Sequence, residues 1–524
     1  MPEQGSHPPS SASPMALKPV LGLLAAGAIV VGEVIGSGIF LSPRQVAASI
    51  GDRVWLILAL WIVAGIVNLC GALTLAELGA MLPHAGGTYV FLREAYGKLW
   101  AFLWTWAEFW VVRSGSIAVL SVALTMSLLP LMEDAGYFRD AATTLSEDHL
   151  QKVVAEQTEQ LKQLNAMGGN DDSASQETLS RLQADLEMHE RALAGVRQSK
   201  ERTQIAVAVG CIILLTIINV AGVRWGGIVQ VVTTLVKAAF VAFLAILPLL
   251  ALRTAAPQAS LTPPPGGADL LRGIGSALAL IMFAYDGWGN VTLVAEEIRD
   301  PQRNLPRALA LGLILLIVLY TGANLAYHHT LSTTELSQVQ VPAVAVADRL
   351  LPNIGKQLTL SMMMISVFGA LNGNILCGPR ALYAVGRDHT RLRWLARLDP
   401  RTGTPALATV ALSLWSVVLI LLGGYSPEPG KRLYELLVDY TIFGGSMFYF
   451  AAVVAVFVLR ARRPDLPRPY RTWGYPYLPA IFCAFYVFLL GTMLYANTKE
   501  ALVGLSLIAA GIVAYLFLRD RSPT

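Results

Sequence analysis

The chain alternates long apolar segments with short polar connections. Twelve apolar segments are long enough, at roughly 20 residues or more, to span the hydrocarbon core of a bilayer. They lie at residues 17–47, 54–81, 97–131, 204–222, 226–252, 268–297, 305–330, 356–385, 404–424, 433–460, 474–495 and 500–518. This pattern predicts an all-α polytopic membrane protein with twelve transmembrane helices.

Two of these segments carry small, flexible residues at their centres. In the first segment Gly36 and Gly38 flank Ser37, and each glycine lowers helix propensity by about 1 kcal/mol relative to alanine. In the sixth segment Asp286 is followed by Gly287. Unwound backbone at membrane depth is tolerated where it lines a cavity, so both interruptions predict a ligand site. Close packing of helices at small residues is the alternative explanation.

The positions of the two interruptions favour a transporter. They fall in the first helices of two five-helix halves, and such pairs are typical of transporters with inverted repeats and a midplane binding site. We therefore expect a five-plus-five inverted repeat with broken helices 1 and 6, plus two accessory helices. The two breaks should face each other. The second half of helix 1 would begin at Ser37 or Gly38, where free N–H groups and the helix dipole favour a carboxylate.

One polar stretch is too long to be an ordinary connection. Residues 133–203 separate the third and fourth apolar segments and carry fourteen acidic and eight basic residues, a net charge of −6. Apolar residues repeat there at spacings of three and four on both sides of a Gly-Gly-Asn-Asp-Asp turn at 168–172. We expect an antiparallel helical hairpin outside the membrane, which is either a solvated spacer or a docking arm for another protein or subunit.

The expected domain organisation follows from these segments. It comprises a disordered cytoplasmic tail at 1–16, helices 1 to 3 at 17–132, the hairpin insertion at 133–203, helices 4 to 12 at 204–519 and a cytoplasmic tail at 520–524.

Composition and charge exclude several classes of protein. Hydrophobic residues make up 55% of the chain and charged residues 14%, which is too apolar for a soluble protein of this length. Arginines cluster in the loops after helices 8 and 10, so these loops and both termini are expected in the cytoplasm and the hairpin outside. The net charge of +4 gathers in no patch that would suit nucleic acid. All four cysteines lie in apolar segments, so we expect neither a disulfide framework nor a metal site.

Ionisable residues within the apolar segments are candidate functional residues, because a buried charge is costly in a membrane. The strongest signal is Lys237 in helix 5, for which a snorkelling side chain near the interface is the alternative. Glu33 lies one turn before the break in helix 1, and Asp286 lies in the break of helix 6. Both are candidates to carry a proton, as are Glu108 and Arg113 on helix 3. Asp286 has the alternative role of holding the unwound segment through its side chain.

The sequence around the two interruptions resembles a known family. Helix 1 carries Gly-Ser-Gly-Ile-Phe, and helix 6 carries Phe-Ala-Tyr-Asp-Gly-Trp, followed by Glu-Glu-Ile-Arg-Asp-Pro and Arg-Asn-Leu-Pro. Over residues 17–519, apart from the hairpin, the chain is similar to the amino acid–polyamine–organocation superfamily, and within it to the L-type amino acid transporters. The resemblance implies a LeuT-like fold and amino acid transport, which many members perform by exchange without sodium.

The resemblance also implies roles for the residues at matching positions. The substrate carboxylate would lie on the backbone of Gly36, Ser37 and Gly38. The substrate ammonium would meet the carbonyl groups of Ile35, Phe283, Ala284 and Asp286. Phe283 would also act as an aromatic gate, ahead of Gly287 in the break. The pocket for the substrate side chain would be formed by Trp288, Val111, Val112, Ser116, Asn290 and Asn372. Lys237 would occupy the place of a sodium ion between helices 1 and 8, and Glu33 and Lys237 would couple the site to transport.

These expectations converge on a secondary transporter that moves neutral L-amino acids by alternating access, as a sodium-independent exchanger. A proton-coupled amino acid symporter is one alternative, and a receptor that senses an amino acid and signals through the hairpin is another. The sequence contains no nucleophile–base motif, metal cluster or phosphate-binding loop, so we expect no enzymatic activity, no cofactor and no bound metal.

The expected partners are an amino acid substrate and the lipid bilayer, with no nucleic acid. Animal L-type transporters bind an ancillary glycoprotein through a cysteine in the outward loop between helices 3 and 4, whereas residues 133–202 contain no cysteine. No disulfide-linked heavy chain is therefore expected, and the hairpin remains a candidate contact for a second copy or another protein. The expected location is a plasma membrane or a bacterial inner membrane.

Overall fold

The computed structural model describes residues 17–139, 145–166, 173–250, 267–423, 431–496 and 498–518. The tails expected at 1–16 and 520–524 and the turn expected at 168–172 lie outside these residues. The described chain is helical, apart from its connections and one isolated β-bridge between Leu21 and Ile298.

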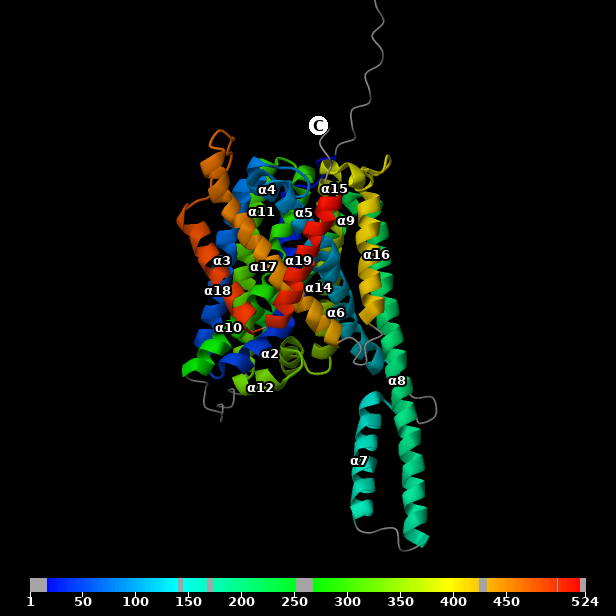
Figure 1. Ribbon diagram of the computed structural model, residues 1–524. Helices are drawn as coiled ribbons and strands as arrows, with labels where there is room; N and C mark the ends of the chain where they lie inside the picture. Colours follow the sequence, from blue (N-terminus) through cyan, green and yellow to red (C-terminus); the bar gives the residue numbers. More distant parts are fainter. Residues whose placement is uncertain are drawn as a thin grey trace, which may run out of the picture.

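The helices carry the labels of Figure 1, and η marks the π-helical or 3-10 segments. In chain order they are α1 (Leu23–Val34), α2 (Gly38–Ile50), α3 (Val54–Met81), α4 (Thr88–Tyr96), α5 (Lys98–Ala107), η1 (Glu108–Val112), α6 (Arg113–Asp134), α7 (Glu147–Ala166), α8 (Ser173–Val220), α9 (Val223–Leu250), α10 (Gly267–Ala284), η2 (Trp288–Glu297), α11 (Pro301–Thr330), α12 (Thr333–Gln338), α13 (Pro342–Leu350), α14 (Gly355–Cys377), α15 (Pro379–Asp388), η3 (Thr390–Ala396), α16 (Ala406–Gly423), α17 (Lys431–Arg462), α18 (Tyr477–Ala496) and α19 (Thr498–Leu518).

The membrane-spanning architecture agrees with the twelve predicted helices. Within the described residues, eleven helical spans are long and apolar enough to cross a membrane, and α19 adds a shorter apolar helix at Leu502–Leu518. Helix 1 consists of α1 and α2, helix 3 of α5, η1 and α6, helix 6 of α10 and η2, and helix 8 of α14 and α15. The spans form one bundle, from which α7 and the first part of α8 project as an arm (Figure 1).

Three short helices were not expected from the hydropathy pattern. α4 lies between helices 2 and 3, and α12 and α13 lie between helices 7 and 8. Each has nine residues or fewer, so none contains enough apolar residues to stand out from a loop in the sequence. α12 is nevertheless well defined by local chemistry, because Ser332 and Glu335 form a reciprocal capping box at its first turn.

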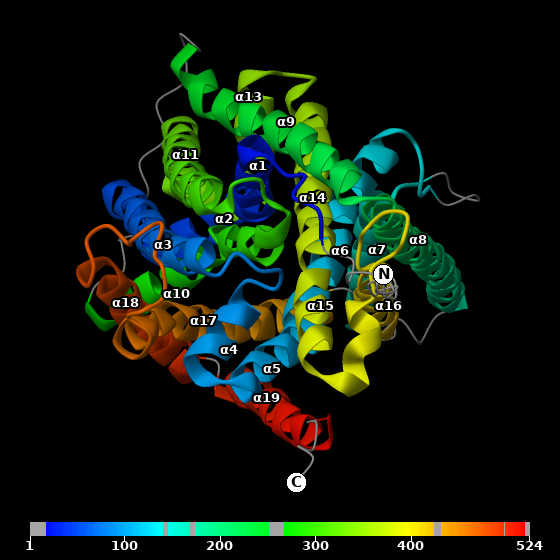
Figure 2. The same ribbon diagram turned by 90° about the horizontal axis from the view of Figure 1, so that it is seen from above.

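The two predicted breaks are present and face each other in the interior of the bundle. α1 ends at Val34 and α2 begins at Gly38, while Tyr285, Asp286 and Gly287 separate α10 from η2. A β-carbon added at Gly38 would lie 2.8 Å from the Cα atom of Ala284, so only glycine allows this approach. Seen from above, α1 lies between α9, α11 and α14 (Figure 2).

The arm is built on a small apolar cluster close to the bundle. α7 and α8 pack against each other, and Leu150, Leu193 and Val196 are buried between them. Lys200 bridges Glu147, at 2.7 Å, and Glu133 at the end of α6, at 3.0 Å. α8 continues for 48 residues from the arm into the membrane-spanning region, so that the arm is an extension of helix 4.

Candidate functional site

The break in helix 1 exposes a set of free backbone donors. The first amides that donate into α2 are those of Phe40 and Leu41, and both donate to the carbonyl of Ser37. The N–H groups of Ser37, Gly38 and Ile39 donate to no acceptor within the described residues. Three consecutive free donors at the start of a helix form an arrangement that favours an anion, and the helix dipole adds to it.

The carbonyl groups beside the breaks are largely engaged by the protein itself. The Ile35 oxygen accepts from the Lys237 ammonium and from the Ser366 hydroxyl, each at 2.9 Å, so both of its lone pairs are in use. The Ala284 oxygen accepts from the Tyr320 hydroxyl at 3.1 Å, and the Phe283 oxygen accepts from the amide of Asp286 at 3.1 Å. The Ile35 carbonyl is therefore not free for a substrate in this conformation, whereas the other two each keep one lone pair.

A cavity of about 110 Å³ lies between the breaks and helices 3, 8 and 10. Thirteen of the residues singled out in the sequence line it: Glu33, Gly36, Ser37, Gly38, Glu108, Val112, Arg113, Ser116, Phe283, Ala284, Asp286, Gly287 and Asn290. The Asp286 side chain is accessible from this cavity, whereas Glu33 is 6% exposed.

Several other residues singled out in the sequence do not line the cavity. The Trp288 indole donates to Asn68 at 2.8 Å and packs on Tyr449, away from the opening. Asn372 donates to the Gly226 carbonyl and to Gln230, so it ties helix 8 to helix 5. Val111 is also absent from the wall, as are Ile35 and Lys237, which lie behind the helix 1 break.

Lys237 is completely buried and lies against the break in helix 1. Its ammonium donates to the carbonyl of Ile35 at 2.9 Å, to that of Ser366 on α14 at 3.0 Å, and to that of Gly32 on α1. The side chain thus joins helix 5 to helices 1 and 8 and does not reach toward the membrane surface. This geometry is that of a fixed cation held by backbone oxygens.

A buried polar network joins four elements on the other side of α1. Arg113 donates to Glu108 at 2.9 Å, to the Asn374 side-chain oxygen at 2.9 Å and to that of Asn290 at 2.7 Å. Asn290 in turn donates to Glu33, and the Arg113 guanidinium lies 3.8 Å from the same Glu33 oxygen. The network connects α1 and η2, which carry the breaks, to helices 3 and 8.

The sequence identified Glu108 and Arg113 but not their pairing. They are five residues apart, a spacing that does not align side chains on an α-helix but does so across the π-helical turn η1. Other cavity residues went unrecognised, among them Thr88, Trp104, Asn374, Phe448 and Tyr449. Asn374 lies two positions from the expected Asn372, which on an α-helix places it on the opposite side.

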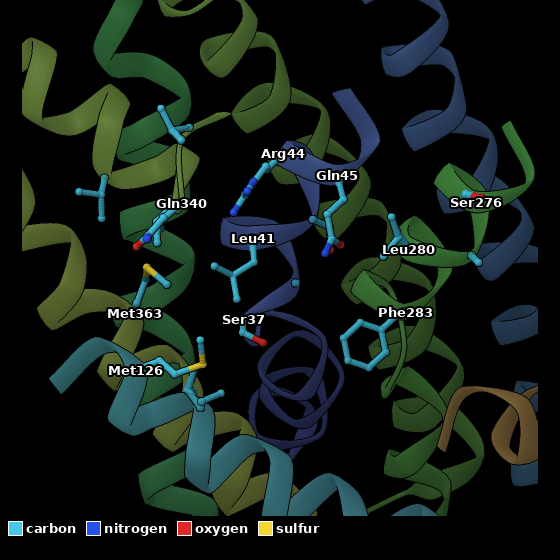
Figure 3. Close-up of a pocket in the computed structure, with 18 of the residues that line it drawn as sticks. Ser37, Leu41, Arg44, Gln45, Met126, Ser276, Leu280, Phe283, Gln340 and Met363 are labelled. Carbon is cyan, nitrogen blue, oxygen red and sulfur yellow. The ribbon is translucent and has the colours of Figure 1, made fainter. Parts of the chain in front are cut away.

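A wide vestibule leads to the same point. It encloses about 2520 Å³ and shares Ser37, Gly38 and Phe283 with the cavity. Figure 3 shows Ser37, which precedes α2, and Leu41 of α2 facing this space, with Phe283 of α10 across from them. Much of its outer wall comes from α2, α10 and α13, so the vestibule opens on the side of the bundle from which the arm projects (Figure 1).

The opposite side of the bundle is closed by ion pairs. Arg380 on α15 binds Glu297 of η2 at 2.7 Å, and each side chain is 1% exposed. Arg93 on α4 binds Asp388 at 3.0 Å. The chain before α1 also pairs with the end of η2, because the Leu21 amide donates to the Glu297 carbonyl at 2.9 Å. Within the described residues, the candidate site therefore opens to the vestibule and is covered by these contacts on the opposite side.

Comparison with known proteins agrees with this architecture. A family model described as "Amino acid permease" matches residues 21–517. The chain belongs to this family. It is therefore a membrane transport protein of the amino acid–polyamine–organocation superfamily, and not an enzyme.

Individual relatives cover nearly the whole chain. The serine/threonine exchanger SteT of Bacillus subtilis (strain 168) is 28% identical over 515 residues, which cover 96% of this chain and 98% of the relative. The b(0,+)-type amino acid transporter 1 of Mus musculus is 28% identical over 501 residues, covering 95% and 88%. The large neutral amino acids transporter small subunit 2 of Mus musculus is 29% identical over 525 residues, covering 97% and 85%.

Proposed function

We propose that this permease exchanges neutral L-amino acids across a cell membrane by alternating access, without sodium. The observation that carries the proposal is the Lys237 ammonium, which lies among carbonyl oxygens of Gly32, Ile35 and Ser366. A cation held there links the helix 1 break to helix 8, so no sodium ion is needed to join them. The name of the serine/threonine exchanger among the relatives supports both exchange and a neutral substrate.

The substrate would bind between the two breaks with its charges separated. Its carboxylate would accept from the free amides of Ser37, Gly38 and Ile39, which are aligned with the dipole of α2. Its ammonium would meet the Asp286 carboxylate and the remaining lone pairs of the Phe283 and Ala284 carbonyls. The side chain would then extend toward Val112, Ser116 and Asn290. Phe283, at the junction of cavity and vestibule, is placed to cover the bound substrate.

The orientation of the site follows from charge and shape. The arginine-rich loops after helices 8 and 10 favour the cytoplasm, which places the arm and the open vestibule outside the cell. In this orientation the structure would represent an outward-open state, with Arg380 and Glu297, and Arg93 and Asp388, closing the cytoplasmic side. Transport would require these pairs to separate while the vestibule closes over Phe283.

Uptake by proteoliposomes tests the proposal. Purified protein is reconstituted with or without internal amino acid, and uptake of labelled serine, threonine or leucine is measured in sodium, potassium or choline buffer. We expect uptake only into loaded vesicles and equal rates in the three buffers. Uptake into empty vesicles, or a requirement for sodium, would contradict exchange or sodium independence respectively.

Proton symport is a second candidate, and one observation favours it. Glu33 is buried beside the helix 1 break, and apart from the Cys377 thiol its Oε1 atom has no hydrogen-bond donor within the described residues. A carboxylate in this position is readily neutralised by a proton. Uptake into empty vesicles that is driven by an inward proton gradient would identify symport and displace exchange as the principal activity.

A further inference from the structure

The cavity contains more negative than positive side chains. Glu33, Glu108 and Asp286 line it together with a single cation, Arg113. The Lys237 ammonium is absent from the wall and is held by carbonyl oxygens behind α1. A neutral amino acid brings one charge of each sign and leaves the excess of negative charge unchanged. This negative charge must therefore be compensated in another way when the cavity closes.

The positive charge of the cavity, on Arg113, already has protein partners. Each nitrogen of the Arg113 guanidinium donates to a partner: Nε to Glu108 at 2.9 Å, and the other two to Asn374 and Asn290. Glu108 therefore takes the close ion pair, and Glu33 is left at 3.8 Å from the guanidinium. Of the two carboxylates within ion-pair distance of Arg113, Glu33 therefore has the weaker contact.

The surroundings of Glu33 show how little else stabilises its charge. Its Oε2 atom accepts from Asn290, and the Cys377 thiol on α14 lies within reach of the carboxyl group; Oε1 has no other hydrogen-bond partner within the described residues and faces α14 at Gly373. The charged and titratable groups that face Glu33 from the elements packed around it are Arg113 and Glu108 on helix 3, Asp286 in the helix 6 break, Lys237 on α9 and Cys377 on α14, whereas Tyr320 on α11 donates to the neighbouring Val34 carbonyl.

We propose that Glu33 is the residue that balances the charge of the loaded cavity, by taking a proton with a neutral amino acid or by binding the cationic side chain of a basic one. This inference rests on the proposed exchange of amino acids and extends its substrate class to basic amino acids. The proton on Glu33 comes from water in the vestibule and returns to water on the side where the substrate leaves. Either loaded form then carries the same total charge.

The inference predicts a specific ion movement in mixed exchange. When a neutral amino acid enters and a basic one leaves, one proton enters with the neutral substrate, and no net charge crosses the membrane. Exchange of one neutral amino acid for another moves no net protons. The two reactions therefore differ in the acidification of the vesicle interior, although their substrates use the same site.

Vesicles loaded with lysine and a pH-sensitive dye test this prediction. External serine is expected to acidify the interior, at a rate that a membrane potential of either sign leaves unchanged. Vesicles loaded with serine should exchange labelled serine without acidification. If lysine–serine exchange proceeds with no acidification and depends on membrane potential, the proposal is wrong. If neither vesicle exchanges serine, the proposed function itself fails, which is a separate result. If serine exchanges and lysine is not a substrate, the extension to basic amino acids is wrong.

The variant Glu33→Gln supplies an independent measurement. Serine exchange by the unmodified protein should fall as the pH rises, because the proton becomes scarce, whereas lysine uptake should not follow this trend. In Glu33→Gln the pH dependence of serine exchange should disappear, whatever its absolute rate. Lysine uptake relative to serine should fall about tenfold or more, the loss expected for one hydrogen bond between charged groups.

Asp269→Asn is the matched control, because Asp269 is an exposed carboxylate on α10 that pairs with Arg272 at 3.4 Å outside the cavity. This variant should keep both the pH profile and the lysine-to-serine ratio. An unchanged pH profile in Glu33→Gln that still exchanges serine would overturn the role assigned to Glu33.

Discussion

Two lysines in this permease have several partners each, yet they lie in opposite environments. Lys237, in the core, is completely buried and donates to three backbone carbonyls from helices 1 and 8. Lys200, at the base of the arm, binds the carboxylates of Glu133 and Glu147 with its side chain 17% exposed. The first is a cation without a carboxylate partner at hydrogen-bond distance, and the second is a partly exposed cation with two carboxylate counterions.

The comparison assigns different roles to the two lysines. Lys237 connects helices of the transport core, whereas Lys200 holds the base of the arm to the ends of helices 3 and 4. Removing Lys237 takes the ammonium away from three buried carbonyl oxygens, of which that of Ile35 keeps the Ser366 hydroxyl as a donor, and an oxygen left unsatisfied costs about 1–3 kcal/mol. Removing Lys200 leaves two carboxylates that water can reach, and exposed pairs contribute only about 0–1 kcal/mol. The core lysine should therefore control transport, whereas the arm lysine should affect the arm alone.

The largest effect is expected from Lys237→Ala. It leaves the Gly32 and Ser366 carbonyls without the ammonium, a cost of about 3 kcal/mol that falls on the contact between helices 1 and 8. Turnover should drop roughly 100-fold, while substrate binding weakens much less. The measurement is exchange in proteoliposomes together with binding of labelled substrate to the detergent-purified variant.

Lys237→Arg should not restore turnover, because a planar guanidinium does not replace a compact ammonium. The ammonium also lies close to α14, since a β-carbon built at the adjacent Gly369 would be only 3.2 Å from the Lys237 nitrogen. Lys200→Ala is the matched control and should exchange normally. Near-normal turnover by Lys237→Ala would show that Lys237, like Lys200, is not required for transport.

The next largest effect is expected from Gly36→Val. A β-carbon at Gly36 would have only ordinary contacts, 3.8 Å from Ala370 and Leu120, so the helices should still assemble. The branched side chain would occupy the space of the substrate carboxylate, and losing one or two bonds to a charged group weakens binding roughly 10- to 100-fold. Competition by unlabelled substrate measures this loss, and methyl esters of the substrate should compete poorly with the unmodified protein.

Gly38 is not a suitable position for the same experiment, although the sequence alone gives no reason to distinguish it from Gly36. A β-carbon there would lie 2.8 Å from the Ala284 backbone, so a substituted protein would lose the contact between the breaks. Membrane insertion and a monodisperse elution profile of Gly36→Val are therefore the required controls. Affinity of Gly36→Val equal to that of the unmodified protein would exclude a carboxylate site at this turn.

The sequence predicted the transmembrane helices and the two breaks because both have strong local signals. An apolar run of sufficient length identifies a span, and glycine beside a polar residue at its centre identifies an interruption. Lys237 was recognisable for a similar reason, since a charge within an apolar run requires compensation. The prediction even gave the partners of Lys237 as helices 1 and 8, through the resemblance to sodium-coupled relatives.

The side chains around the cavity were less predictable, because their direction depends on details of helix geometry. The π-helical turn η1 brings Glu108 and Arg113 together, and nothing in the hydropathy pattern indicates such a turn. The rotation of α14 directs Asn374 into the cavity and Asn372 toward helix 5. Trp288 lies one residue after the break, yet its hydrogen bond to Asn68 holds the ring away from the opening.

A smaller effect is expected from acid at the base of the arm. Burial opposes the charge of Glu147, but its hydrogen bonds with Lys200 and Arg197 prevail and lower the pKa of Glu147 below its usual 4.5. A lowered carboxyl pKa stabilises the arm above the usual value, and this contribution is lost as the pH falls from about 4.5 through the lowered pKa. The distribution of distances between a spin label on α7 and one on the membrane end of α8 should broaden as the pH falls through that range.

Glu147→Gln should show the broadened distance distribution already at neutral pH. Lys237 is remote from these groups, so transport in Glu147→Gln should not change. An arm whose label distances stay narrow down to pH 3 would show that the apolar contacts of Leu150, Leu193 and Val196 hold it without the ion pairs.

The smallest effect on transport is expected from removing the arm. Replacing residues 140–198 by a short Gly/Ser linker retains Glu133 and Lys200 at the ends of helices 3 and 4 and deletes the part that projects from the bundle. The cavity residues all lie outside this stretch, and so do the partners of Lys237. Substrate affinity and turnover should therefore remain within about twofold of the full chain, because substitutions away from buried contacts typically change stability by less than about 0.5 kcal/mol. The contrary result would be loss of binding in a deletion variant that elutes as a folded protein. It would show that the position of the arm is coupled to the transport core through the continuous helix α8.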